Sequence, residues 1–141
     1  MSEIERALKE NGIYMTKTKG DSMNPMLYNG SRIIIVPPKF PLKKYDVPVY
    51  RRDGHYTMHR IVKITRKGYI ICGDNRAHLE RDITDNDIVG VLSSFYSTDG
   101  KLTECTDAEY LDYAKKVCRS LPRRRLKYII CRILSKLHLR R

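Results

Sequence analysis

Short apolar and β-branched runs, separated by turn signals, fill the first hundred residues of the chain. The clearest run covers residues 31–36 and ends at Pro37-Pro38, which predicts a buried strand. Further strands are predicted by similar runs at residues 13–18, 46–52, 55–64, 69–72 and 88–92, with a short return strand after residue 100. Because turn signals recur about every eight to twelve residues, this pattern predicts a mainly β fold with an all-β core.

Two positions refine the strand prediction. Asp53-Gly54 is a strong signal for a two-residue hairpin turn between the predicted strands at 46–52 and 55–64. Pro48 removes one backbone donor from the first of these strands, so we predict that this strand lies at the edge of its sheet. The segment from 73 to 87 carries no strand pattern and is predicted to be a loop.

Helical patterns lie at the two ends of the chain. Ser2 with Glu5 forms a capping-box pattern that predicts a short helix ending at Asn11-Gly12. Thr106 with Glu109 repeats the pattern and predicts a helix running toward residue 120. A proline suits the first turn of a helix, so Pro122 predicts the start of a second C-terminal helix. At about 100° per residue its apolar side chains fall on one arc: Leu126, Ile129, Ile130, Ile133, Leu134 and Leu137.

The positive charge is concentrated at the C-terminal end. The formal net charge is +12, yet residues 115–141 hold 11 Lys or Arg and no Asp or Glu, so residues 1–114 carry 17 basic and 16 acidic groups. A chain of 141 residues is long enough for one core. We therefore predict one β-domain, residues 1–105 with its short N-terminal helix, followed by a basic helical extension, residues 106–141.

Several features bear on location and cofactors. No apolar run approaches the roughly 20 residues needed to cross a bilayer, and the charged N-terminus does not resemble a secretory signal. The four cysteines, at positions 72, 105, 118 and 131, have no metal-binding spacing, so we expect reduced thiols, no metal and no cofactor. These features predict a cytoplasmic chain. For residues 122–141, three interpretations stay open: contact with an anionic membrane surface, packing of the apolar face on the β-core, and the less favoured binding of nucleic acid.

A candidate nucleophile lies in a constrained turn, Gly20-Asp21-Ser22-Met23-Asn24-Pro25. Glycine permits backbone angles that other residues avoid, while Pro25 fixes its own φ and biases the residue before it. Such a turn can hold a hydroxyl and nearby N–H groups in one orientation, as a nucleophile with an oxyanion hole requires. Alone, the octapeptide from residue 20 to 27 favours an ordinary polar loop over a catalytic turn.

Three later blocks strengthen the case for a catalytic serine. They follow in order: Tyr45-Asp46-Val47-Pro48-Val49, Met58-His59-Arg60-Ile61-Val62 and Gly73-Asp74-Asn75. Together with the serine turn, these blocks resemble the signal peptidase I / LexA-like serine peptidase superfamily over residues 13–95. The resemblance implies a β-core of coiled antiparallel sheets, a serine endopeptidase activity and an extended peptide substrate with small residues near the cut.

The resemblance also implies roles for individual residues. Bacterial signal peptidases and LexA-type proteins use a lysine as the base, whereas the block around His59 is similar to the His type found in endoplasmic-reticulum and archaeal signal peptidases. It thus implies Ser22 as nucleophile, His59 as general base and the Ser22 N–H as an oxyanion donor. Gly20, Asp21, Met23 and Pro25 would shape that turn.

A third residue is expected to orient the imidazole, as in Ser-His-Asp enzymes. The spacing after Gly73-Asp74-Asn75 does not match the family cleanly. Asp82 is our first choice, Glu80 is the second, and Asp74 is expected to order the loop. The other histidines (positions 55, 78 and 138) are expected to be solvated, although His78 lies near enough in sequence to approach the site.

The function predicted from these residues is removal of a leader from a precursor peptide or protein. Two rivals remain. One is a LexA-like regulator that cleaves itself and associates with DNA, which is disfavoured by the short segment before Ser22 and by a His base. The other is a non-catalytic member of the fold that only binds peptides. Oligomeric state is left open.

Overall fold

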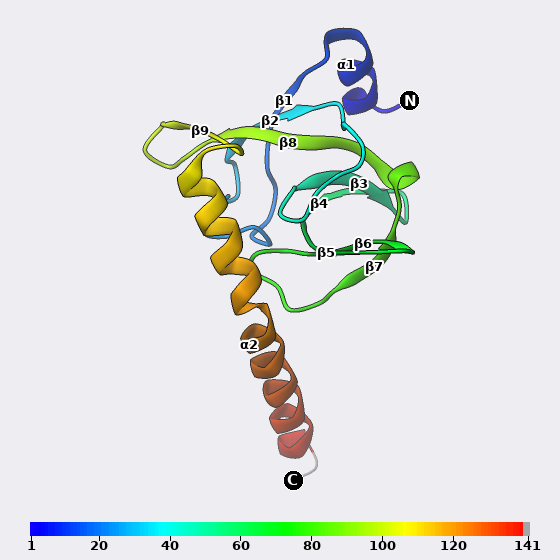
Figure 1. Ribbon diagram of the computed structural model, residues 1–141. Coiled ribbons are helices and arrows are strands. Elements are labelled where there is room, and N and C mark those ends of the chain that lie inside the picture. Colours follow the sequence, from blue (N-terminus) through cyan, green and yellow to red (C-terminus); the bar gives the residue numbers. More distant parts are fainter. Residues whose placement is uncertain (140–141) are drawn as a thin grey trace.

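The computed structural model describes residues 1–139 (Figure 1). In chain order the helices and strands are α1 (Glu3–Asn11), β1 (Tyr14–Lys17), β2 (Arg32–Val36), β3 (Pro48–Arg52), β4 (His55–Met58), β5 (Arg60–Thr65), β6 (Gly68–Cys72), β7 (Glu80–Ile83), β8 (Ile88–Tyr96), β9 (Leu102–Glu104) and α2 (Ala108–Leu139). One turn of 3-10 helix, Asp85–Asp87, precedes β8.

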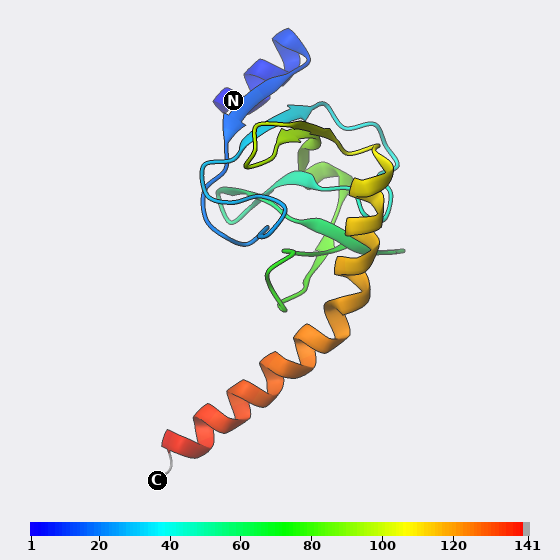
Figure 2. The ribbon, with the colours of Figure 1, turned by 90° about the vertical axis from the view of Figure 1, so that its left-hand side faces the viewer.

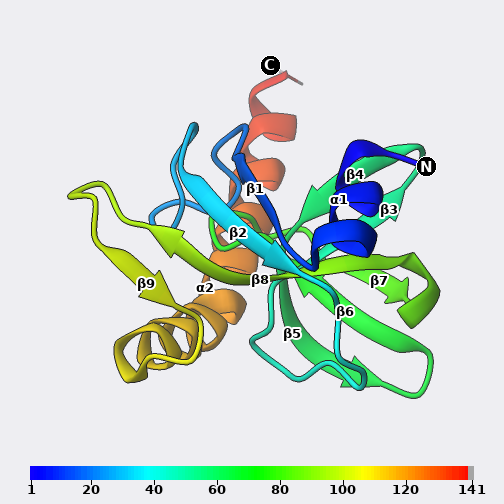
Figure 3. The same cartoon turned by 90° about the horizontal axis from the view of Figure 1, so that it is seen from above.

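Two antiparallel sheets form the body of the molecule. The larger sheet has the strand order β1-β2-β8-β3-β4, with β9 added to β8, and the smaller has the order β5-β6-β7. The nine-residue strand β8 runs through the larger sheet and pairs with β2, β3 and β9 (Figure 3). This arrangement of a β-core between an N-terminal and a C-terminal helix confirms the predicted fold class.

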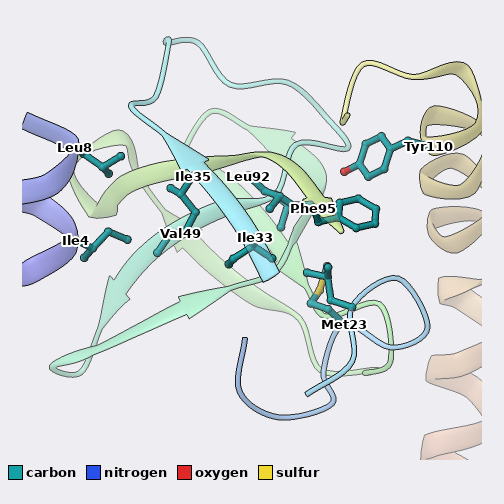
Figure 4. Packing of buried hydrophobic residues seen from close by; sticks show 11 residues of the cluster. Ile4, Leu8, Met23, Ile33, Ile35, Val49, Leu92, Phe95 and Tyr110 are labelled. Atoms are coloured by element: carbon teal, nitrogen blue, oxygen red, sulfur yellow. The ribbon is translucent and has the colours of Figure 1, made fainter. Parts of the chain in front are cut away.

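The core follows from alternation along these strands. On β2 the side chains of Ile33 and Ile35 are buried while their neighbours are not, as period-two alternation requires. They pack with Val49 of β3 and with Ile4 and Leu8 of α1 (Figure 4). A second buried cluster joins the two sheets and contains Leu42, Tyr50, Ile61, Tyr69, Ile71, Ile83 and Ile88.

The predicted edge position of the Pro48 strand is wrong. β3 lies inside the larger sheet, hydrogen-bonded to β4 on one side and β8 on the other. Pro48 is the first residue of the strand, where a missing N–H is tolerated. The Asp53-Gly54 turn is confirmed: both residues have positive φ, 52° and 77°, and they join β3 directly to β4.

The single strand predicted over residues 55–64 is divided. β4 belongs to the larger sheet and β5 to the smaller, and His59 is the residue between them. The loop predicted at 73–87 is also partly wrong, because it contains β7, which pairs with β6. Both differences shape the site, since they determine where His59 and Glu80 lie.

The N-terminal capping box is confirmed. The Ser2 side chain accepts a hydrogen bond from the Glu5 N–H, the Glu5 carboxylate accepts from the Ser2 N–H, and Gly12 ends α1 with a φ of 69°. The helix is also attached to the β3–β4 hairpin. Glu5 forms an ion pair with Arg51, and its carboxylate accepts a hydrogen bond from the Tyr56 hydroxyl.

The two C-terminal helices predicted from Pro122 are instead one helix, α2, with Pro122 in its interior. It begins at Ala108, so the residue before it is Asp107 rather than the predicted cap Thr106. Tyr110, Ala114 and Leu121 of its first half are buried, whereas the second half extends away from the body (Figures 1 and 2). In the part of the chain that the structure describes, no helix is long and apolar enough to cross a bilayer.

Candidate active site

Ser22 lies in the loop that joins β1 to β2. The loop is closed at its base by the hydrogen bonds Thr18 N–H to Ser31 O (2.9 Å) and Gly30 N–H to Thr18 O (2.8 Å). Met23 and Leu27 bury their side chains in the core and anchor the loop from below. Ser22 itself remains partly exposed, so the loop presents its hydroxyl at the surface of the body.

Four residues were predicted to shape this turn, and their roles differ. Gly20 has a φ of 85° and donates its N–H to the Asn29 side chain (2.9 Å). Asp21 forms an ion pair with Arg76 that holds the pKa of the Asp21 carboxyl below its ordinary value. Met23 is a core residue, and Pro25 is exposed at the far side of the turn.

The Gly73–Arg76 loop after β6 is joined to the serine loop. The Asn75 N–H donates to Ser22 O (2.8 Å), and the Asn75 side-chain amide donates to Asp21 O (3.3 Å). A Cβ at position 73 would lie 2.7 Å from Ser22 O and 3.2 Å from Cδ2 of His59. Glycine is therefore required here by close approach, and the backbone of Ser22 and the ring of His59 meet at this one position.

Two polar side chains contact the Nδ1 side of the His59 ring. Nδ1 lies 3.1 Å from Oε1 of Glu80 and 3.2 Å from the Tyr50 hydroxyl, and that hydroxyl donates to the same Glu80 oxygen at 2.7 Å. Within residues 1–139 these are the hydrogen bonds of the ring, so Nε2 has no protein partner there. The imidazole is thus held from its Nδ1 side, and its Cδ2 atom, which is bonded to Nε2, lies against Gly73 next to the Ser22 carbonyl.

The charge state of this cluster is defined by its contacts. The hydrogen bond from His59 lowers the pKa of Glu80, burial opposes the shift, and the Tyr50 hydroxyl adds to it. Burial, with the nearby Glu80 charge, raises the pKa of Tyr50 well above its ordinary value. Glu80 is thus an anion near neutral pH, while Tyr50 keeps its proton and acts as the donor.

The carboxylate beside the ring is Glu80, our second choice, and not Asp82. Tyr69 pairs with Ile83 and Ile71 pairs with Glu80, so two residues of β7 oppose one residue of β6. Asp82 lies in this bulge with a φ of 60°, is exposed, and makes no hydrogen bond or ion pair to His59 among the described residues. The bulge turns Asp82 away and leaves Glu80 facing the ring.

Sequence reasoning missed Tyr50. Its side chain is fully buried, and it reaches the site because β3 lies inside the larger sheet, which we had not predicted. A tyrosine in a strand is more often a core residue, so the sequence gives no signal of this contact. The other three histidines (positions 55, 78 and 138) are exposed, as expected.

Asp74, which was expected to order the loop, forms a buried ion pair with Arg60. Its two carboxylate oxygens each accept a hydrogen bond from Arg60 at 2.8 Å, and both side chains are completely buried. Tyr113 of α2 also donates to Asp74 (3.0 Å), and Arg60 donates to the Tyr110 hydroxyl (2.9 Å). Burial disfavours the charge on Arg60, but the hydrogen bonds and charge of Asp74 outweigh this effect and raise the Arg60 pKa.

A groove of about 550 Å³ runs from Ser22 to the start of α1. The two end strands of the larger sheet, β1 and β4, both line it, so the curled sheet brings its edges to either side of the groove. Its lining includes the apolar residues Met23, Leu27, Ile33, Ile35, Val49 and Met58. A concave apolar surface beside a candidate nucleophile is a typical substrate-binding site.

Comparison with protein families identifies the family of the chain. The family model described as peptidase S24-like matches residues 3–101, which include all the residues of the His59 cluster and Ser22. The chain belongs to the peptidase S24-like family. A comparison with curated proteins found no match. Membership in this peptidase S24-like family confirms the predicted superfamily, and it supports a peptidase type of hydrolase.

Proposed function

We propose that this S24-like protein is a serine endopeptidase in which Ser22 is the nucleophile, His59 the general base and Glu80 the residue that orients the base. The observation that carries the proposal is the hydrogen-bonded group of His59, Glu80 and Tyr50, which meets the backbone of Ser22 at Gly73. A serine hydroxyl is a poor nucleophile until a base takes its proton, and this group is built to supply one.

The contacts at Nδ1 determine how the base works. Glu80 is an anion and can only accept, so the Nδ1 of a neutral His59 carries the proton and Nε2 holds the lone pair. Nε2 takes the Ser22 proton as Oγ attacks the scissile carbonyl, and the negative charge of Glu80 stabilises the imidazolium that forms. The proton then passes to the leaving amine, and a water molecule, activated in the same way, releases the acyl group.

The absence of a direct Ser22–His59 hydrogen bond among residues 1–139 is compatible with this role. Catalytic hydrogen bonds are often long before substrate binds and tighten in the complex. The Ser22 N–H is the expected oxyanion donor, because it projects from the residue that becomes acylated.

The groove supports an extended peptide as the substrate. Its two sides are the end strands β1 and β4, whose outer backbone groups can hydrogen-bond to an added strand. Its floor is apolar, so small or apolar substrate side chains fit it best. We propose that the substrate is a precursor peptide or protein whose leader is trimmed, with a His base like that of endoplasmic-reticulum and archaeal signal peptidases.

Self-cleavage is the second candidate, since membership in the family supports either activity. Cleavage of a separate substrate is favoured because the segment before Ser22 is folded into α1 and β1, with α1 held by Arg51 and Tyr56. Within residues 1–139 no segment lies across the groove as an added strand. Intact mass measured over time separates the two activities: self-cleavage produces two fragments, and cleavage of other peptides leaves the chain whole.

The proposed activity is tested with a library of extended peptides and mass spectrometry. The native protein should cut peptides with small or apolar residues before the scissile bond. Ser22→Ala should remove all cleavage without changing the fold, and Ser93→Ala, at a serine of β8 outside the groove lining, is the matched control. Cleavage that persists in Ser22→Ala would overturn the proposal.

A further inference from the structure

The second half of α2, residues 122–139, has an apolar face that nothing in the described chain covers. Six of its apolar side chains are between 47% and 59% exposed: Leu126, Ile129, Ile130, Ile133, Leu134 and Leu137. At about 100° per residue they occupy an arc of roughly 140° along one side of the helix. Packing of this arc on the β-core, which was one of the expectations from sequence, does not occur in the structure (Figure 2).

Basic side chains border the apolar arc on both sides. By the same helical geometry, Lys127 lies along one border, and Lys136, Arg125 and Arg132 lie along the other. No acidic residue occurs between position 115 and the end of the chain. By the same geometry Arg123 falls within the arc at its N-terminal end, so the apolar face is continuous from Leu126 to Leu137. With its flanking positive charge, this face has the pattern of helices that lie in the plane of an anionic membrane surface.

Two other kinds of partner fit this face less well. A second copy of the same helix would bring two sets of basic borders together without an acidic residue to pair with them, which is repulsive. Nucleic acid would satisfy the positive charges but leave the apolar arc in water. A membrane surface that is anionic at its headgroups and apolar beneath them complements both features.

We propose that residues 122–139 bind the surface of a membrane containing anionic lipids, with the apolar arc inserted among the acyl chains and the basic borders at the headgroups. The attachment point of the helix bears on the site. Arg124 donates to the Arg76 carbonyl (3.1 Å), and Arg76 forms the ion pair with Asp21 beside Ser22. Binding through this segment therefore holds the serine loop near the lipid surface, where a membrane-associated precursor would be presented.

The proposal is tested by co-flotation of the full chain with vesicles, either of phosphatidylcholine alone or of phosphatidylcholine with one quarter phosphatidylglycerol. The native protein should float with the anionic vesicles, and its binding to them should weaken as the salt concentration rises. Ile133→Gln, in the middle of the arc, should lower the partition coefficient on the order of tenfold. Ser135→Gln adds the same side chain on the opposite face and should change it less than about twofold. Arg132→Gln and Lys136→Gln each remove one positive charge, and each should lower the partition coefficient about fivefold.

Several results would overturn the proposal. One is that the native protein fails to float with anionic vesicles, and another is that Ile133→Gln and Ser135→Gln weaken vesicle binding equally. A third is sedimentation showing that the free protein is a dimer that Ile133→Gln dissociates. Binding to a random-sequence oligonucleotide with undiminished affinity in Ile133→Gln, without flotation, would assign the segment to nucleic acid instead. Because Ser22→Ala should float like the native protein, this test is independent of the proposed peptidase activity. Circular dichroism of both glutamine variants verifies that α2 is retained.

Discussion

The role of Glu80 gives the sharpest test of the site, through the substitution Glu80→Gln. The glutamine has nearly the same shape, and its carbonyl can still accept the hydrogen bond from Tyr50. The Nδ1 of His59 lies 3.1 Å from that same oxygen, so the glutamine carbonyl can accept from the ring as well and both contacts are kept. What the substitution removes is the negative charge, which stabilises the imidazolium that forms when His59 takes the Ser22 proton.

The expected magnitude follows from the geometry. In Ser-His-Asp enzymes the corresponding acid-to-amide change lowers kcat about 10⁴-fold. The Glu80 side chain is 20% exposed and that of His59 15%, so water can replace part of the lost stabilisation. We therefore expect kcat to fall on the order of 10²–10⁴-fold with KM little changed, because the lost contact stabilises the transition state rather than the bound peptide.

The assay is steady-state cleavage of the best peptide from the library, with Asp82→Asn as the matched control. Asp82 is two residues away on the same strand, carries the same charge and is turned to solvent by the bulge. Its amide variant should retain the native rate within about twofold. Full activity in Glu80→Gln, or loss of activity in Asp82→Asn, would refute the assignment of Glu80.

Four further predictions follow from the same contacts. Tyr50→Phe removes a hydrogen bond to a charged acceptor and should cost about 1.5–3 kcal/mol of unfolding free energy in urea titrations, with kcat lowered about tenfold. Gly73→Ala places a Cβ 2.7 Å from Ser22 O and should lower kcat about 100-fold. If the circular dichroism spectrum stays native, the loss comes from a displaced active site and not from unfolding. Asp74→Asn leaves the buried Arg60 charge unpaired and should destabilise the protein by about 3–5 kcal/mol in thermal melts; a change below about 1 kcal/mol would contradict the buried pair. The lowered pKa of Glu80 predicts stability that is present above the ordinary carboxyl pKa of about 4.3 and lost as pH falls through the native value, so Glu80→Gln should show a flatter acid limb in urea midpoints.

The sequence was sufficient for most strands because their apolar runs and turn residues are local signals. It was insufficient where neighbouring strands decide the outcome. The run over residues 55–64 has one continuous pattern, yet β4 pairs with β3 and β5 with β6, so the chain changes sheet at His59. Pro48 suggested an edge, but a proline at the first residue of a strand is also tolerated in the interior of a sheet.

The serine and the histidine were identified from motifs, whereas the rest of the cluster depended on register. Glu80 and Asp82 are two residues apart and would face the same side in a regular strand, so alternation could not distinguish between them. The bulge opposite Ile70 determines which of the two carboxylates faces His59, and no local residue type predicts this bulge. Pro122 failed as a helix boundary because α2 continues through it from Ala108 to Leu139, although a proline in a helix interior removes one backbone hydrogen bond.

The most direct test of the central claim is covalent labelling of the native protein with a fluorophosphonate, followed by peptide mapping in a mass spectrometer. We expect a single adduct on Ser22, absent from Ser22→Ala, and a labelling rate that falls by on the order of 10³-fold in His59→Ala. An adduct elsewhere, no adduct, or a rate that is the same with and without the His59 imidazole would contradict a Ser22–His59 catalytic pair.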